Sequence, residues 1–435
     1  MSILLEHAWA VTMDPAQPVL RDAFVAVEGS RIASVGTVRP AGDFDRVMDC
    51  RGKALLPGFV NAHTHLPMTL MRGYGGGHDL QHWLNDYIFP AEDKLDSRSV
   101  TAGTQLALAE LIAAGVTCVA DMYYFCPHIA QAVADSGLSA NISRSVTCFA
   151  PVDDPADYYA CRELRELEQQ WNGYDDGRIR VDASVHGEYT SFSAPKMWEY
   201  LGRYAADHRL GMQVHVSETY SEHEECKARH GGKTPLQILD DYGVWQAGGL
   251  AAHCVWVSDE DMELMVRRSI TAVHNPVSNL KLGSGVARVP ALLRAGVNVA
   301  LGTDGVASNN SHDMLEEIKL AAILHKGVNR DPMAVTARQA LEMATVNGAR
   351  ALGRSTGVIA PGKDADLILI DLTRPELTPC HDVEENLVFS AHGSDVVMNM
   401  ARGRVIYENG SFLTLDLERI RREMEEYALP RIFGA

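Results

Sequence analysis

The chain has 435 residues, of which 46% are hydrophobic and 22% charged, and its formal net charge is −18. This length is enough for one large barrel or for two to three ordinary domains. No run of Lys and Arg stands out, so we expect no nucleic-acid partner, because a surface that follows phosphates needs clustered cations. No apolar run approaches the ~18 residues of a membrane-spanning helix, so we expect no membrane partner either.

The cysteines and the first residues bear on the compartment. The eight cysteines form no Cys-x-x-Cys pair, and several lie in apolar runs, where a free thiol behaves as a small hydrophobic side chain. The segment from Met1 to His7 has neither the basic start nor the long apolar core of a secretory signal peptide. We therefore expect a reduced, cytoplasmic enzyme, and we expect it to form a homo-oligomer.

The two ends of the chain share one pattern. Residues 1–56 are predicted to form short strands joined by turns, for example 24–28 and 31–35 around Gly29-Ser30. Residues 357–435 show the same pattern, and Asn409-Gly410 is a strong turn signal. Together they predict one small β-sandwich domain built from both termini.

The region between them, 57–356, alternates short apolar runs with amphipathic segments. Near-continuous apolar strands separated by helices indicate parallel strands that are buried on both faces. Eight such units predict an α/β fold with a (β/α)8 TIM barrel rather than an open doubly wound sheet. The candidate strands are 54–65, 116–123, 140–146, 179–186, 212–216, 250–255, 270–274 and 297–303.

The first candidate strand ends in His63-Thr64-His65. Successive side chains on a strand point to opposite faces, so both imidazoles project to the same side and can hold one metal ion. Such a pair also occurs by chance on ordinary surfaces. The other strand ends favour the metal interpretation, because function in such barrels lies at the C-terminal ends of the strands. These ends carry Asp121, Arg144, His186, His215, His253, His274 and Asp304.

Two of these ends have a more specific pattern. Glu218 follows His215 by three residues, so the histidine can bind metal while the carboxyl group lies over the same space as a proton carrier. The alternative is a solvated glutamate at the start of a helix over 222–229. Asp304 ends a wholly apolar strand, where an uncompensated carboxylate is costly, so we prefer a metal ligand to a helix N-cap.

The fourth candidate strand bears on the number of metal ions, because it has no lysine at its end. Binuclear sites in such barrels often use a lysine at the end of that strand, and the segment 180–188 contains none. One metal ion is therefore expected. His253 is interpreted either as a further ligand or as a donor to a metal-bound hydroxide.

These residues carry a resemblance to a known family. The segment 57–65, His215-x-x-Glu218, His253 and Gly302-Thr303-Asp304 resemble the amidohydrolase superfamily in its mononuclear deaminase branch, over nearly the whole chain. Longer motifs at 63–73, 83–92, 275–282 and 303–310 resemble the 5-methylthioadenosine/S-adenosylhomocysteine deaminases, and triazine chlorohydrolases are near neighbours of that group. The loop 75–78, Gly-Gly-Gly-His, departs from the acidic residues expected there.

The resemblance implies hydrolytic deamination of a purine nucleoside with one bound Zn²⁺, or Fe²⁺ or Mn²⁺ in its place. The ligands would be His63, His65, His215 and Asp304. Asp304 would take a proton from the attacking water and His253 would orient the hydroxide. Glu218 would donate a proton to a ring nitrogen.

The same resemblance implies the residues that bind the substrate. Glu92 would hold the ribose hydroxyls, Arg144 and His186 would line the nucleoside pocket, and Trp83 would be a further contact. A surface ion pair is the alternative for both Glu92 and Arg144. Two alternatives remain for the whole chain: a guanine- or cytosine-type deaminase or triazine hydrolase on the same scaffold, and a non-catalytic scaffold protein.

Overall fold

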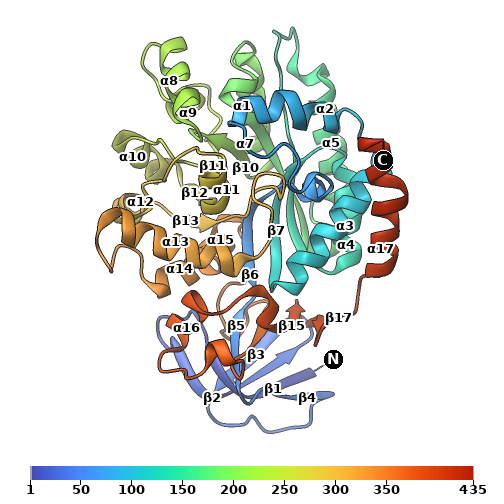
Figure 1. Ribbon diagram of the computed structural model, residues 1–435, viewed down its shortest axis with the longest axis vertical. Coiled ribbons are helices and arrows are strands. Elements are labelled where there is room, and N and C mark those ends of the chain that lie inside the picture. Colours follow the sequence, from blue (N-terminus) through green and yellow to red (C-terminus); the bar gives the residue numbers. More distant parts are fainter. Residues whose placement is uncertain (1, 435) are drawn as a thin grey trace.

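The computed structural model describes residues 2–434 and contains two sheets (Figure 1). An eight-stranded sheet occupies the middle of the chain, and a nine-stranded sheet is built from both ends. The predicted α/β fold with a barrel and an additional terminal sheet is confirmed. The strands of the barrel are β6 (Phe59–Thr64), β7 (Val116–Tyr123), β8 (Ser139–Arg144), β9 (Ile179–Gly187), β10 (Met212–Val216), β11 (Gly249–His253), β12 (Ile270–His274) and β13 (Val299–Leu301).

The barrel strands pair in chain order, and all of these pairs are parallel. All eight residues of β7 are buried, as expected for a strand covered on both faces. The sheet closes where the segment after β13 meets β6, through an isolated bridge between Thr64 and Asp304. There the backbone N–H of Asp304 donates to the carbonyl of His63 at 3.0 Å. Closure therefore brings the end of the eighth strand beside the end of the first.

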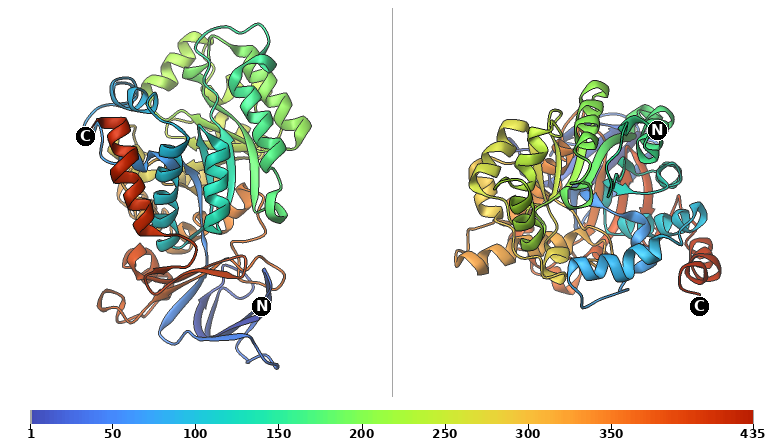
Figure 2. Two further views of the ribbon diagram at one scale, coloured as in Figure 1. Left: turned by 90° about the vertical axis from the view of Figure 1, so that its right-hand side faces the viewer. Right: turned by 90° about the horizontal axis from the view of Figure 1, so that it is seen from above.

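Helices surround the strands when the molecule is seen from above (Figure 2). Helix α10 (Asp259–Arg268) shows why these segments are helical: Ser258 caps it, and acidic residues occupy its first turn while Arg267 and Arg268 occupy its last. The helices along the barrel are α3 (Ser97–Ala113), α4 (Cys126–Ser136), α5 (Tyr159–Trp171), α6 (Tyr174–Gly177), α7 (Pro195–His208), α8 (Tyr220–Arg229), α9 (Pro235–Asp241), α10 (Asp259–Arg268), α11 (Pro276–Lys281), α12 (Val289–Ala295), α13 (Met314–Asn329), α14 (Ala337–Met343) and α15 (Val346–Ala351).

The terminal sheet lies below the barrel in Figure 1 and joins segments far apart in the chain. Strands β5 and β14 pair antiparallel, with Leu55 opposite Leu369. Asn399 on β15 ties this sheet to the barrel, since its side-chain amide donates to the carbonyls of Ile112 (2.9 Å) and Val116 (2.8 Å). The strands are β1 (Ser2–Val11), β2 (Val19–Glu28), β3 (Arg31–Gly36), β4 (Arg46–Asp49), β5 (Lys53–Pro57), β14 (Leu367–Asp371), β15 (Val396–Ala401), β16 (Arg404–Glu408) and β17 (Ser411–Phe412).

Two further groups of helices flank the barrel. The short helices α1 (Leu80–His82) and α2 (Phe89–Glu92), joined by the π-helical turn Trp83–Ile88, lie across the end of the barrel opposite the terminal sheet (Figure 1). The C-terminal helix α17 (Leu417–Glu423) packs against α3, where Arg98 pairs with Glu423, and α18 (Leu429–Phe433) contacts α2; the two helices run along the outside of the barrel (Figure 2). Helix α16 (Val383–Phe389) packs against α13 and α14. Among residues 2–434, no helix has the length and apolarity needed to cross a membrane.

Candidate active site

The metal-capable side chains predicted from the strand ends come together in the structure. His63 lies in β6 next to its last residue, and His65 directly follows that strand. His215 lies on β10, and Asp304 follows β13. The candidate ligand atoms of His63, His65 and His215 lie within 4.8 Å of one another, and so do those of His63, His253 and Asp304. His63, His215 and Asp304 are at most 5% exposed. Four imidazoles and one carboxylate thus share one buried space.

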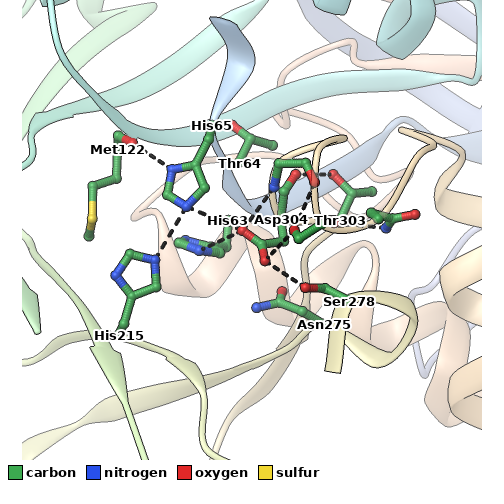
Figure 3. A network of polar contacts seen from close by, with 12 residues as sticks. His63, Thr64, His65, Met122, His215, Asn275, Ser278, Thr303 and Asp304 are labelled. Carbon is green, nitrogen blue, oxygen red and sulfur yellow. Dashed lines mark hydrogen bonds and ion pairs between the residues drawn. The ribbon is translucent and has the colours of Figure 1, made fainter. Parts of the chain in front are cut away.

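The hydrogen bonds of two imidazoles define which nitrogens carry lone pairs. Nδ1 of His65 donates to the carbonyl of Met122, and Nδ1 of His215 donates to the carbonyl of His186, each at 2.6 Å. Because a carbonyl only accepts, both Nε2 atoms of the neutral rings carry lone pairs, and they face each other at 3.3 Å (Figure 3). Two facing lone pairs repel unless a cation or a proton lies between them.

The remaining atoms of the cluster fit the same cation. Nε2 of His63 is buried and has no hydrogen-bond partner among the described residues. Oδ1 of Asp304 lies 3.2 Å from Nε2 of His65 and 3.5 Å from Nε2 of His63 (Figure 3). The donor atoms are three imidazole nitrogens and one carboxylate oxygen, and the Nδ1 hydrogen bonds of His65 and His215 fix two of the rings. Such a set of donors is typical of a catalytic zinc site. The residues present therefore fit a divalent metal ion.

Asp304 is held in place by neighbours that the sequence analysis missed. Its Oδ2 accepts hydrogen bonds from the hydroxyls of Ser278 (2.7 Å) and Ser308 (2.9 Å), and its Oδ1 accepts from the backbone N–H of Gly305 (2.8 Å). Gly302 allows the segment that carries Asp304 to lie against β6, because a Cβ atom at Gly302 would lie 2.9 Å from the backbone nitrogen of His63. Ser278 lies in the short helix α11 and Ser308 in the turn after Asp304, and their only signal in the sequence is that they fall within the two motifs at 275–282 and 303–310.

Glu218 lies in the same pocket, beyond the end of β10, and is 2% exposed. Its Oε2 is 3.6 Å from Nε2 of His253, and its Oε1 accepts a hydrogen bond from the hydroxyl of Ser284 at 3.4 Å. Burial is the main cause that raises the pKa of the Glu218 carboxyl group above its usual range. A raised pKa favours the protonated form, which is the form that can donate a proton.

His253 ends β11 with its side chain 1% exposed. Its Nδ1 is hydrogen-bonded to the side-chain oxygen of Asn279 at 2.9 Å, which turns Nε2 toward the shared pocket. The backbone of His253 has a φ of +73°, a conformation that is uncommon for a residue with a side chain. Such conformations persist where the surrounding structure holds them, which is common at functional sites.

Glu92, His186 and Trp83 also line this pocket, which we call the inner pocket. The hydroxyl of Tyr123 donates to Oε1 of Glu92 at 2.6 Å. Burial raises the pKa of Glu92 to about 7 against the effect of this hydrogen bond. His186 contacts the hydroxyls of Ser145 (3.0 Å) and Tyr189 (3.2 Å). Three of the four residues expected on the substrate side therefore reach the inner pocket.

Arg144 is the exception. It lines an adjoining cleft rather than the inner pocket, and its guanidinium pairs with Glu163 and donates to the carbonyl of Ser145. The rings of Tyr124 and Tyr159 lie 4.9 and 5.5 Å from its guanidinium carbon. Arg144 thus forms an ion pair, but its own side chain is 5% exposed, so this is not the surface ion pair that the sequence analysis kept as an alternative.

Similarity to known proteins places this site in a family. The sequence profile of the amidohydrolase family matches residues 54–406, which span the barrel and the strands β14 and β15 of the terminal sheet. The chain belongs to the amidohydrolase family. A 5′-deoxyadenosine deaminase of Methanosarcina acetivorans is 41% identical over 97% of this chain and 96% of its own length. A 5-methylthioadenosine/S-adenosylhomocysteine deaminase of Thermoanaerobacter pseudethanolicus is 38% identical over 98% of this chain and 99% of its own length.

A solved structure has the same fold as this amidohydrolase. An adenosine deaminase from Xanthomonas campestris with bound zinc superposes with a TM-score of 0.93 at 33% identity, over 100% of this chain and 99% of that one. The resemblance stated from the sequence motifs is confirmed. The chain is a member of a family of hydrolases, and a zinc ion is present in one of its structural neighbours.

Proposed function

We propose that the protein is a zinc-dependent aminohydrolase that deaminates adenosine-type nucleosides to their inosine analogues and ammonia. The substrates are 5-methylthioadenosine, S-adenosylhomocysteine, 5′-deoxyadenosine and adenosine. The observation that carries the proposal is the buried carboxyl group of Glu218 beside a cluster of imidazoles that fits a metal ion. The names of the relatives, which are deaminases of such nucleosides, support the substrate class.

His63, His65, His215 and Asp304 would hold one zinc ion, with Fe²⁺ or Mn²⁺ as alternatives. When bound, such an ion acts as a Lewis acid that lowers the pKa of water to about 7. Met122 and His186 orient two of the imidazoles through their carbonyl groups, and Ser278 and Ser308 orient the carboxylate of Asp304. These hydrogen bonds hold the donor atoms in place before substrate arrives.

The proton transfers follow from the positions of three side chains. Oδ1 of Asp304 faces the imidazoles and accepts the proton that the attacking water gives up. Nε2 of His253, on another side of the pocket, orients the attacking oxygen. The protonated carboxyl group of Glu218 donates to a ring nitrogen of the purine, and the same group can then assist the departure of ammonia.

The inner pocket also has a side that suits the sugar. Glu92 accepts from Tyr123 through Oε1, which leaves Oε2 for a ribose hydroxyl. His186 and Trp83 lie along the same pocket and contact the nucleoside. A free base or a triazine has no vicinal diol for Glu92, so this carboxyl group favours a nucleoside over the alternatives on the same scaffold.

One experiment tests the function as a whole. Purified protein is incubated separately with 5-methylthioadenosine, S-adenosylhomocysteine, 5′-deoxyadenosine and adenosine, and ammonia release is measured. Guanine, cytosine and a triazine are assayed in parallel as alternative substrates. We expect turnover of the nucleosides in preference to the bases and the triazine. Preference for a base or a triazine would favour the alternative reactions, and no turnover of any compound would favour a non-catalytic scaffold.

The cellular setting is part of the proposal. All eight cysteines are free in the structure, and seven of them are buried. This supports a reducing compartment such as the cytoplasm. We propose a homo-oligomer, which sedimentation of the purified protein can test.

A further inference from the structure

One wall of the inner pocket comes from a single segment, residues 73–92, which we call the cover. The cover follows β6, begins with the glycine-rich loop 73–78 and lies across the end of the barrel opposite the terminal sheet (Figure 1). Six of its side chains line the inner pocket: Leu80, Trp83, Leu84, Ile88, Phe89 and Glu92. A shift of the cover would therefore move a large part of the surface that a substrate contacts.

The glycine-rich loop packs closely on the rest of the cover. The indole N–H of Trp83 donates to the carbonyl of Tyr74 at 3.3 Å. Gly75 has a φ of +68°, and a Cβ atom there would lie 2.7 Å from Cγ of Tyr87 and 3.2 Å from Cδ1 of Trp83. A side chain at Gly75 would therefore push the loop away from both rings. The position of Trp83 in the inner pocket thus depends on the position of Tyr74.

The ring of Tyr74 is supported by the other end of the chain. Its centroid lies 4.8 Å from that of Phe433, a separation at which aromatic rings attract each other. Phe433 is the last residue of α18, which contacts α2, and Figure 2 shows this helix beside the cover. Residues that are far apart in the sequence therefore meet behind the wall of the inner pocket.

Helix α18 is itself held against the barrel by the turn between the cover and α3. Nζ of Lys94 donates to the carbonyl of Ile432 at 2.8 Å, and the carboxylate of Asp96 pairs with Arg431 at 3.0 Å. The side chain of Ile432 is 0% exposed. These contacts on both sides of the helix keep Phe433 in place as a support for the cover.

We propose that Phe433 is a positioning residue for substrate binding, which holds Tyr74 and, through Tyr74, holds Trp83 and the rest of the cover over the substrate. This inference rests on the proposed function, and it gives a role in binding to α18, none of whose described residues lines the inner pocket. Without the ring of Phe433, the cover would spend less time in the binding-competent position, and the apparent affinity would fall by the same fraction. The imidazole cluster and Glu218 lie on other elements, so the chemical step would be unaffected.

The kinetics of Phe433→Ala with 5′-deoxyadenosine test the inference. We expect KM to rise at least about threefold, because an aromatic pair is lost, while kcat stays within about twofold and bound metal is unchanged. Phe433→Tyr keeps the ring and should restore KM to nearly that of the parent. The matched control is Phe412→Ala, which removes from the terminal sheet a ring that lies 5.2 Å from that of Tyr407. An unchanged KM or a loss of bound metal in Phe433→Ala, or an equal rise in KM in Phe412→Ala, would overturn the inference.

A double-mutant cycle tests the route through Tyr74. Tyr74→Ala keeps the backbone carbonyl that Trp83 contacts and removes only the ring. If Phe433 acts through this ring, the double variant should raise KM no more than the more severe of the two single variants. Effects that multiply in full would show that Phe433 acts by another route, and would overturn the inference.

Hydrogen exchange separates this inference from the proposed function. We expect the backbone amides of residues 73–88 to exchange faster in Phe433→Ala than in the parent or in Phe412→Ala, whether or not a nucleoside is turned over. Equal exchange in the three proteins would overturn the inference alone. No ammonia from any nucleoside with the parent protein would contradict the proposed function, and with it the role of Phe433 in substrate binding, while faster exchange would still show that Phe433 holds the cover.

Discussion

The carboxylate of Glu222 accepts a hydrogen bond of 2.7 Å from the backbone N–H of Glu218. The same carboxylate accepts from the backbone N–H of Ser217 at 3.0 Å, and Ser217 has a φ of +49°. One buried carboxylate on the first turn of α8 thus fixes the left-handed turn that carries the proton donor. Glu222 is therefore a positioning residue for Glu218, a role that its place in a capping box alone does not reveal.

Glu222→Gln tests this role. An amide group can accept at only one of its two positions, so one backbone N–H loses its partner and Glu218 becomes less well placed. We expect kcat for 5′-deoxyadenosine to fall by about tenfold or more, with KM and bound metal nearly unchanged and with an altered pH profile. The matched control is Glu224→Gln on the exposed face of the same helix. Loss of metal and kcat together would instead indicate a general structural defect.

Replacement of the proton donor itself should have a larger effect. Glu218→Gln keeps the shape of the side chain but removes the transferable proton, so kcat is expected to fall at least ~10²-fold while fold and metal content persist. Circular dichroism and metal analysis of the same preparation provide the controls. Near-normal turnover by this variant would mean that the proton comes from another group.

The sugar side of the inner pocket can be tested separately. Losing a hydrogen bond to a buried hydroxyl costs on the order of 1–3 kcal/mol, and more when a charged partner is left alone. Glu92→Ala should therefore lower kcat/KM for nucleosides by about tenfold or more and affect any residual activity on a free base far less. If the variant lowers both activities equally, Glu92 does not bind the ribose. The same nucleosides tested with Tyr123→Phe show whether the hydroxyl that orients Glu92 is needed.

The terminal sheet and the barrel are coupled at one buried side chain. Asn399 is 0% exposed, and its amide donates to two carbonyl groups of the barrel. Asn399→Leu removes the side-chain donor from both carbonyls, and the carbonyl of Ile112 then keeps the backbone N–H of Gly115 at 3.2 Å. The loss should lower the free energy of unfolding by about 1 kcal/mol or more. Denaturant unfolding measures this change. A variant as stable as the parent would show that the two hydrogen bonds do not stabilise the junction.

The sequence predicted the position of a site residue where a short-range pattern or the closure of the barrel determines that position. His63 and His65 could be assigned to one face because a strand has a period of two, and Asp304 could be placed beside them because a barrel closes its last strand on its first. Ser278 and Ser308 could not be assigned, because their contact with Asp304 depends on how helix α11 and the turn after Asp304 pack in three dimensions. The pairing of Arg144 depends likewise on tertiary structure.

Arg144 illustrates that limit most clearly. Its partner Glu163 lies 19 residues away on another element, and no local pattern links the two. Its strand position placed Arg144 at the end of β8 and the family resemblance placed it in the nucleoside pocket, whereas in the structure it lines the cleft that adjoins the inner pocket. The location of a charged side chain at a strand end is therefore predictable from sequence, but its orientation and its partner are not.

Metal-dependent ammonia release is the most direct test of the account. Purified protein is analysed for metal, assayed with 5-methylthioadenosine, treated with a chelator, assayed again, and then reloaded with zinc; His63→Ala is analysed in parallel. We expect about one metal ion per chain, loss of activity on chelation, recovery on reloading, and little metal in the variant. Full activity in metal-free protein, or about two metal ions per active chain, would contradict the single metal site on which the account depends.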